Sequence, residues 1–121
     1  MRSARALKRH AEDLNLPLIL AGDFNASLPG HPGGPDGSNV KDSAVAEFTK
    51  DKEFIYAPQK HLREDGMTFP STEPRSIIDW ILIPKDFSFR SYRVIHSTLS
   101  DHRMVAADIV VPKSARRVAK D

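Results

Sequence analysis

Hydrophobic and polar positions in the first part of the chain follow a helical spacing and then an unbroken apolar run. Small and apolar side chains recur every three or four residues up to Leu14, while arginines and lysines lie elsewhere on the helical wheel. This spacing predicts an amphipathic helix over residues 2–14, ended by Asn15 and Pro17. Residues 16–21 are continuously apolar, which predicts a strand buried on both faces.

The rest of the chain alternates loops with short apolar segments. Residues 27–39 are rich in glycine and proline and predict a long loop, and residues 59–66 predict a polar connection. Helical spacing returns at residues 41–51, with three apolar side chains expected to face the core. Further segments predict strands: residues 54–57, 67–70, 77–83, 87–96 and 104–111.

This order of elements predicts an α/β (α+β) fold, with a mostly antiparallel sheet and two covering helices. If one central sheet carries both helices on one side, its other face lacks cover. We therefore expect that face to need a partner.

Composition narrows the class of protein without naming a function. The 121 residues fit one globular domain, since 40% are hydrophobic and 28% are charged. No stretch reaches the roughly 18 to 20 apolar residues that a membrane span needs. The basic N-terminus lacks the apolar segment of a signal peptide. The absence of cysteine excludes disulfides, a thiolate nucleophile and a thiolate zinc site.

Basic residues gather at both ends of the chain, although the formal net charge is only +2. They fall within residues 2–9 and 113–120. We interpret them as one solvated helix face and one basic tail. A footprint for the phosphate backbone of a nucleic acid is the alternative interpretation.

Two polar side chains, Asp23 and Asn25, follow the predicted strand at residues 16–21. A carboxylate after a buried strand lies where open α/β sheets hold their ligands. In an extended Asp-Phe-Asn segment both polar side chains point to one side, and the amide suits a phosphate oxygen or a metal-bound water. A plain turn explains the same residues, because aspartate and asparagine favour turns.

Asp79 is a second candidate, because it lies inside the most apolar predicted strand, with the isoleucines at positions 77, 81 and 83 expected on its face. An unpaired buried carboxylate is costly, so Asp79 needs a partner. A structural cation such as Arg75 is one possibility. The other is a histidine that the carboxylate orients.

His102 is the histidine expected beside Asp79, and it lies in Ser-Asp-His (residues 100–102) before the last predicted strand. Adjacent Asp101 and His102 cannot face the same way in an extended chain, so we expect Asp101 to take a metal or water while His102 reaches a phosphate. A carboxylate behind an imidazole fixes its tautomer and raises its basicity. A helix cap or a surface pair also explains an Asp-His step. The other four histidines are interpreted as surface residues.

Four segments in this order resemble the endonuclease/exonuclease/phosphatase superfamily, which includes deoxyribonucleases, abasic-site endonucleases, sphingomyelinases and inositol-polyphosphate 5-phosphatases. They are Leu-Ile-Leu-Ala-Gly-Asp-Phe-Asn (18–25), Met-Thr-Phe-Pro-Ser (67–71), Ile-Asp-Trp-Ile-Leu (78–82) and Ser-Asp-His-Arg (100–103). The middle two look most like the short bacterial members. The resemblance implies a four-layer α/β/β/α sandwich, of which this chain matches the C-terminal half.

The resemblance also implies a role for each matching residue. Asp23 would position or deprotonate the attacking water, and Asn25 would hold that water and a phosphate oxygen. Asp101 would be a ligand or outer-shell partner of a Mg²⁺ or Mn²⁺ ion, and Asp23 and Asn25 would be metal-binding residues as well. His102, paired with Asp79, would stabilise charge on the phosphoryl oxygens. Oxygen ligands suit Mg²⁺, and a metal with an imidazolium offsets the developing charge.

The family's N-terminal half supplies an asparagine and a glutamate that hold the principal metal, and the predicted first helix cannot match them. We therefore expect residues 1–112 to be the C-terminal half of such a domain and residues 113–121 to be a basic tail. A lone half exposes its inter-sheet face. A fragment, a truncated product and a self-associating pair all remain open.

The expected function is divalent-metal-dependent hydrolysis of a phosphoester, with the activity of the isolated chain left open. A nucleic acid, a phospholipid head group and a sugar phosphate are equally open as substrates, and so is the compartment. The alternative is a non-catalytic binding or assembly module that keeps the half-fold. A serine hydrolase is disfavoured, because no Gly-x-Ser-x-Gly elbow occurs.

Overall fold

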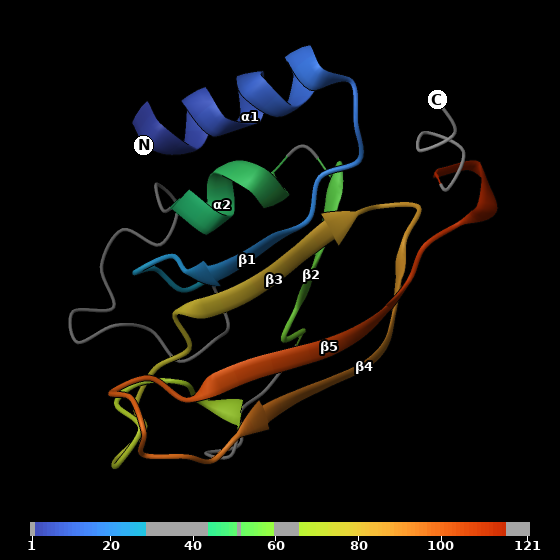
Figure 1. Ribbon diagram of the computed structural model, residues 1–121. Helices are drawn as coiled ribbons and strands as arrows, with labels where there is room; N and C mark the ends of the chain where they lie inside the picture. Colours follow the sequence, from blue (N-terminus) through green and yellow to red (C-terminus); the bar gives the residue numbers. More distant parts are fainter. Residues whose placement is uncertain (1, 29–43, 51, 60–65, 116–121) are drawn as a thin grey trace.

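The computed structural model describes residues 2–28, 44–50, 52–59 and 66–115, which form two helices and five strands (Figure 1). The fold is α+β, as predicted, and the strand pairings within these residues are antiparallel. None of the described helices is long and apolar enough to cross a bilayer. The elements are α1 (Arg2–Leu14), β1 (Leu20–Asp23), α2 (Ala44–Thr49), β2 (Phe54–Ala57), β3 (Asp79–Pro84), β4 (Ser88–Ile95) and β5 (Met104–Val110).

The described elements follow the predicted order, and β2 to β5 begin and end within two residues of the predicted bounds. Parts of four predictions lie outside the described residues. They are most of the long loop (29–39), both ends of the helix predicted at 41–51 (41–43 and 51), most of the polar connection (60–65) and the end of the basic tail (116–121).

Helix α1 has the predicted bounds and lies over α2 (Figure 1). Its small residue Ala4 is 6% exposed and joins the core cluster of α2, whereas Leu14 stays 50% exposed. The Arg5 guanidinium lies 3.6 Å from the buried Glu47 carboxylate of α2, which ties the two helices together. The helix ends before Asn15, which has a left-handed φ of 52° typical of a helix C-terminus.

Strand β3 is the centre of a three-stranded sheet with the order β1-β3-β2. Its side chains are buried on both faces because alternate residues enter different layers. Trp80 and Leu82 pack on the helical side, and Ile81 packs on the other side. Ile77 belongs to the Trp80 cluster, not to the face of Asp79. The predicted alternation therefore holds only from Asp79 onward, where β3 begins.

Strand β1 differs most from its prediction. It begins at Leu20, and Leu16 and Ile19 before it are 46% and 44% exposed. The strand predicted at residues 16–21, buried on both faces, is therefore wrong. The physical reason is that β1 is an edge strand: Leu20 packs against the helical core while Ala21 is exposed.

Strands β4 and β5 form a separate two-stranded sheet on the side of β3 away from the helices (Figure 1). Tyr92 and Val105 pack with Ile81 and Ile83 there. The prediction of one central sheet with an uncovered face is therefore wrong. Because β3 is apolar on both faces, the chain supplies a layer for each.

The segment predicted as a strand at residues 67–70 is a loop. It makes one isolated bridge, between Phe69 and Ser76, just before β3. Pro70 lacks a backbone N–H and the chain reverses after it, so no ladder extends from this bridge.

Candidate active site

The pairing of β1 with β3 brings two carboxylates face to face. Asp23, the last residue of β1, is the cross-strand partner of Asp79, the first residue of β3. Gly22 leads into Asp23 with a φ of 146°, a conformation that residues with a side chain rarely adopt. Asp79 is 7% exposed, whereas the Asp23 side chain is 39% exposed. One end of the sheet therefore carries one buried and one open carboxylate.

His102 reaches this end of the sheet from the loop before β5. Its Nδ1 lies 2.9 Å from Asp79 Oδ2 and 3.1 Å from Oδ1. The hydrogen bond to Asp79 raises the pKa of His102 above its ordinary value, burial opposes this rise, and the charges of nearby aspartates add to it. The buried carboxylate thus has a partner, and the partner is a histidine rather than Arg75.

The second imidazole nitrogen faces Asp23. His102 Nε2 lies 3.6 Å from Asp23 Oδ2, which is close but longer than a hydrogen bond. The other oxygen, Oδ1, accepts the backbone N–H of Asn25 at 2.7 Å, in a turn where Asn25 has a left-handed φ of 49°. The turn and the candidate site are therefore one feature, because the turn orients the carboxylate toward the imidazole.

Asp101 lies at the rim of the site with an exposed side chain. Its Oδ1 accepts the hydroxyl of Ser100 at 3.3 Å, and its backbone carbonyl accepts the N–H of Ser71 at 2.7 Å. The structure thus gathers three of the five candidates closely, with one ligand atom of each within 4.8 Å of the others. These three are Asp23, Asp79 and His102.

Two aromatic side chains at this site had no role in the sequence analysis. The Phe69 ring lies 4.7 Å from the His102 ring, with the planes at 44°. The Tyr92 hydroxyl, from β4, is buried and has no hydrogen-bond partner among the described residues. Burial and then the charge of Asp79 raise the pKa of Tyr92. Phe69 lies in the Met-Thr-Phe-Pro-Ser segment (67–71) that carries the family resemblance. The alternation along β4 indicates only that Tyr92 is a core position.

Oxygen donors for a divalent cation lie beside the histidine. Asp23, Asp79 and His102 form a possible metal site of two carboxylates and one imidazole. Carboxylate and amide oxygens are the hard ligands that Mg²⁺ and Mn²⁺ take. The carboxylates of this group therefore fit a divalent cation of this kind.

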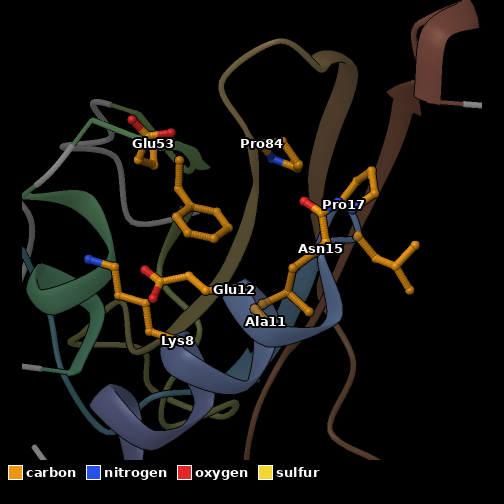
Figure 2. A pocket seen from close by; sticks show the side chains of 10 residues that line it. Lys8, Ala11, Glu12, Asn15, Pro17, Glu53 and Pro84 are labelled. Carbon is orange, nitrogen blue, oxygen red and sulfur yellow. The ribbon is translucent and has the colours of Figure 1, made fainter.

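Hollows lie at both ends of β3. The one at Asp79 has a volume of about 420 Å³ and is also lined by Leu99 and His102. The one at Pro84 is larger, about 520 Å³, and there Lys8 and Glu12 of α1 lie across from Glu53 and Pro84 (Figure 2). Asp79 and His102 line the hollow at Asp79, with the Asp23 carboxylate close to both, and the hollow at Pro84 has no histidine in its described lining.

A known family matches the part of the chain that contains Asp23, Asp79 and His102. The Endonuclease/Exonuclease/phosphatase family matches residues 1–102 of this chain, a span that includes α1 and ends at His102. No curated protein or solved structure matches the chain. The family consists generally of hydrolytic enzymes that act on phosphoesters. Since the matched span covers well over half of the residues, this chain belongs to the Endonuclease/Exonuclease/phosphatase family.

Proposed function

We propose that this site hydrolyses phosphoesters with the help of a divalent metal ion, by attack of water in line with the leaving group. One observation carries the proposal: the imidazole of His102 lies between two carboxylates, bonded to Asp79 through Nδ1 and facing Asp23 through Nε2. Family membership supports the same class of reaction.

The Asp79–His102 pair would stabilise negative charge on the phosphoryl group. Donation of the Nδ1 proton to Asp79 leaves Nε2 directed at the open side of the site. The raised pKa of His102 keeps the imidazole protonated over a wider pH range. A protonated Nε2 donates a hydrogen bond to a phosphoryl oxygen, where charge develops in the transition state.

Asp23 would receive the proton of the attacking water. Its Oδ1 is held by the Asn25 N–H at 2.7 Å, so its Oδ2 remains aimed into the site. The adjoining amide side chain of Asn25 offers a donor and an acceptor, suited to holding the water and a phosphate oxygen. Proton transfer to a positioned carboxylate contributes about a hundredfold or more to such rates.

The oxygens of Asp101, Asp23 and Asn25 would hold a Mg²⁺ or Mn²⁺ ion. When bound, such an ion polarises the phosphoryl group and offsets its developing charge. In the absence of the ion, the carboxylates of Asp23 and Asp101 add negative charge near His102. Acceptance of the water proton by Asp23 and stabilisation of the phosphoryl charge by His102 would be done by the side chains themselves.

The test is hydrolysis of bis-p-nitrophenyl phosphate and p-nitrophenyl phosphate by the full chain with Mg²⁺ or Mn²⁺. We expect turnover that EDTA abolishes and that His102→Ala lowers about a hundredfold or more. His96→Ala is the matched control, since His96 is an exposed histidine beyond the end of β4, and it should retain the activity.

Unchanged turnover in EDTA or in His102→Ala would contradict the proposal. Absence of turnover from a chain shown to be folded would contradict it as well, and would favour a non-catalytic binding module. The preferred ester would separate phosphodiester from phosphomonoester substrates.

A further inference from the structure

The loop segment Thr68–Ser71, here called the strap, holds the chain just before His102. The Ser71 N–H donates to the carbonyl of Asp101 at 2.7 Å. The Ser71 hydroxyl donates to the carbonyl of Ser100 at 2.6 Å. The two residues that precede the histidine are therefore both fixed by one residue, which is itself 4% exposed.

The strap also holds the chain just after His102. The Arg103 N–H donates to the Thr68 carbonyl at 2.7 Å, and Arg103 Nε donates to the Ser71 carbonyl at 3.1 Å. Between these anchors the Phe69 ring lies against the imidazole. Hydrogen bonds therefore hold the residues before and after His102, and Phe69 packs on one face of the His102 ring.

The same strap fixes the chain beside Asp79. The Thr68 hydroxyl is fully buried and accepts the N–H of Ile78, the residue before Asp79, at 3.2 Å. The Thr68 N–H donates to the Ser76 carbonyl at 2.8 Å. The two partners of the central hydrogen bond, Asp79 and His102, are 23 residues apart in sequence, yet the strap contacts the flanks of both.

We infer that the strap sets the position of His102 relative to Asp79, and that Ser71 is a positioning residue for the reaction proposed above. Only the expected effect of Ser71 on turnover rests on the proposed function. The placement of the imidazole is a property of the folded chain and is measured separately. Small displacements of a reacting group reduce rates strongly, so a fixed imidazole matters more than the stability that the strap adds.

Ser71→Ala tests the inference, and Ser76→Ala is its matched control. Both serines are 4% exposed and both hydroxyls donate to a backbone carbonyl. The Ser76 hydroxyl donates to the carbonyl of Phe69 at 3.2 Å, and among the hydrogen bonds described Ser76 makes none to residues 100–103. Equal losses in Tm are expected, and only Ser71→Ala should disturb His102.

The first readout is the NMR signals of the His102 ring at one fixed pH, identified by their loss in His102→Gln. We expect Ser71→Ala to move or broaden these signals by more than their line width, and Ser76→Ala to leave them in place. Phe69→Leu should also move them, because the ring current of Phe69 is lost. Identical His102 signals in wild type and Ser71→Ala would overturn the inference.

The second readout is turnover with Mg²⁺. Ser71→Ala should lower kcat about tenfold with little change in KM, since a misplaced imidazole affects the transition state more than substrate binding. Ser71→Thr, which keeps the hydroxyl, should restore both kcat and the His102 signals. Displaced His102 signals in a chain without any turnover would uphold the positioning role and overturn only the proposed function.

Discussion

The two ends of β3 differ in the polar groups that line their hollows. At Asp79 two carboxylates and an imidazole converge within 4.8 Å. At Pro84 the hollow is larger and is lined by the carboxylates of Glu12 and Glu53 (Figure 2). Glu53 pairs with Lys85 at 3.3 Å in an exposed ion pair. The volume of a hollow therefore does not select the candidate site here. The convergence of two carboxylates on one histidine does.

Strand register produces this difference. Asp23 and Asp79 are direct cross-strand partners, and like charges in such a position destabilise a sheet. The imidazole of His102 lies between them and offsets that repulsion when protonated. The hydrogen bond to Asp79 is the main cause of the raised pKa of His102, and the negative charge of Asp23 adds to it, so the register that places Asp23 beside Asp79 contributes to that rise.

The largest effect on turnover is expected from a substitution of Asp79. Asp79→Asn removes the negative charge beside His102 and replaces one of its two acceptor oxygens by an NH2 donor, and we expect turnover with Mg²⁺ to fall about ten- to a hundredfold. Asp108→Asn on β5 is the control, since Asp108 is exposed and bonds only Ser91 among the contacts described. Equal turnover in Asp79→Asn and the wild type would remove the imidazole–carboxylate pair from the mechanism.

Trp80→Phe should weaken the fold near the site. Trp80 is fully buried and its indole N–H donates to the Ala26 carbonyl at 2.7 Å, next to the turn that orients Asp23. Loss of this bond leaves a carbonyl without its partner, so the free energy of unfolding should fall by about 1 to 3 kcal/mol. Urea unfolding measures it, and an unchanged midpoint would show that the bond contributes nothing.

The pH dependence of stability tests how the two carboxylates, Asp23 and Asp79, affect the pKa of His102. The folded-state pKa of His102 lies above its ordinary value, so the folded chain binds this proton more tightly than the unfolded chain. The resulting stabilisation is complete below about pH 6.5 and disappears as the pH rises through the raised pKa. Urea unfolding from pH 6 to pH 9 should show that decline, and it should be smaller in Asp79→Asn. An equal decline in His102→Gln would assign it to other groups.

The smallest effect is expected at the other end of β3. Glu12→Gln, in the larger hollow, should leave turnover within about twofold of wild type and stability within about 0.5 kcal/mol, as for most exposed substitutions. Turnover assays and urea unfolding measure both. A strong loss of turnover in Glu12→Gln would assign function to this end as well, and would end the contrast between the two hollows.

The candidate site was only partly readable from sequence. Asp79 could be singled out because a carboxylate inside an apolar strand must find a partner, and the candidates for that partner were few. The approach of Asp23 to the far nitrogen of His102 depends on the register of β1 against β3, for which residues 16–25 give no signal. The bonds between the strap and residues 100–103 could not be predicted either, because they join backbone and side-chain groups of loops that are distant in sequence.

The sequence by itself determined the elements whose signals are local. The helical spacing of residues 2–14 specifies α1, and the apolar run around Trp80 specifies β3, because periodicity and burial act on neighbouring residues. Only the tertiary structure decided that β1 lies at an edge, that β4 and β5 form a second sheet, and that His102 lies between two carboxylates. Those outcomes depend on layer packing and strand register, which arise from contacts between residues far apart in the chain.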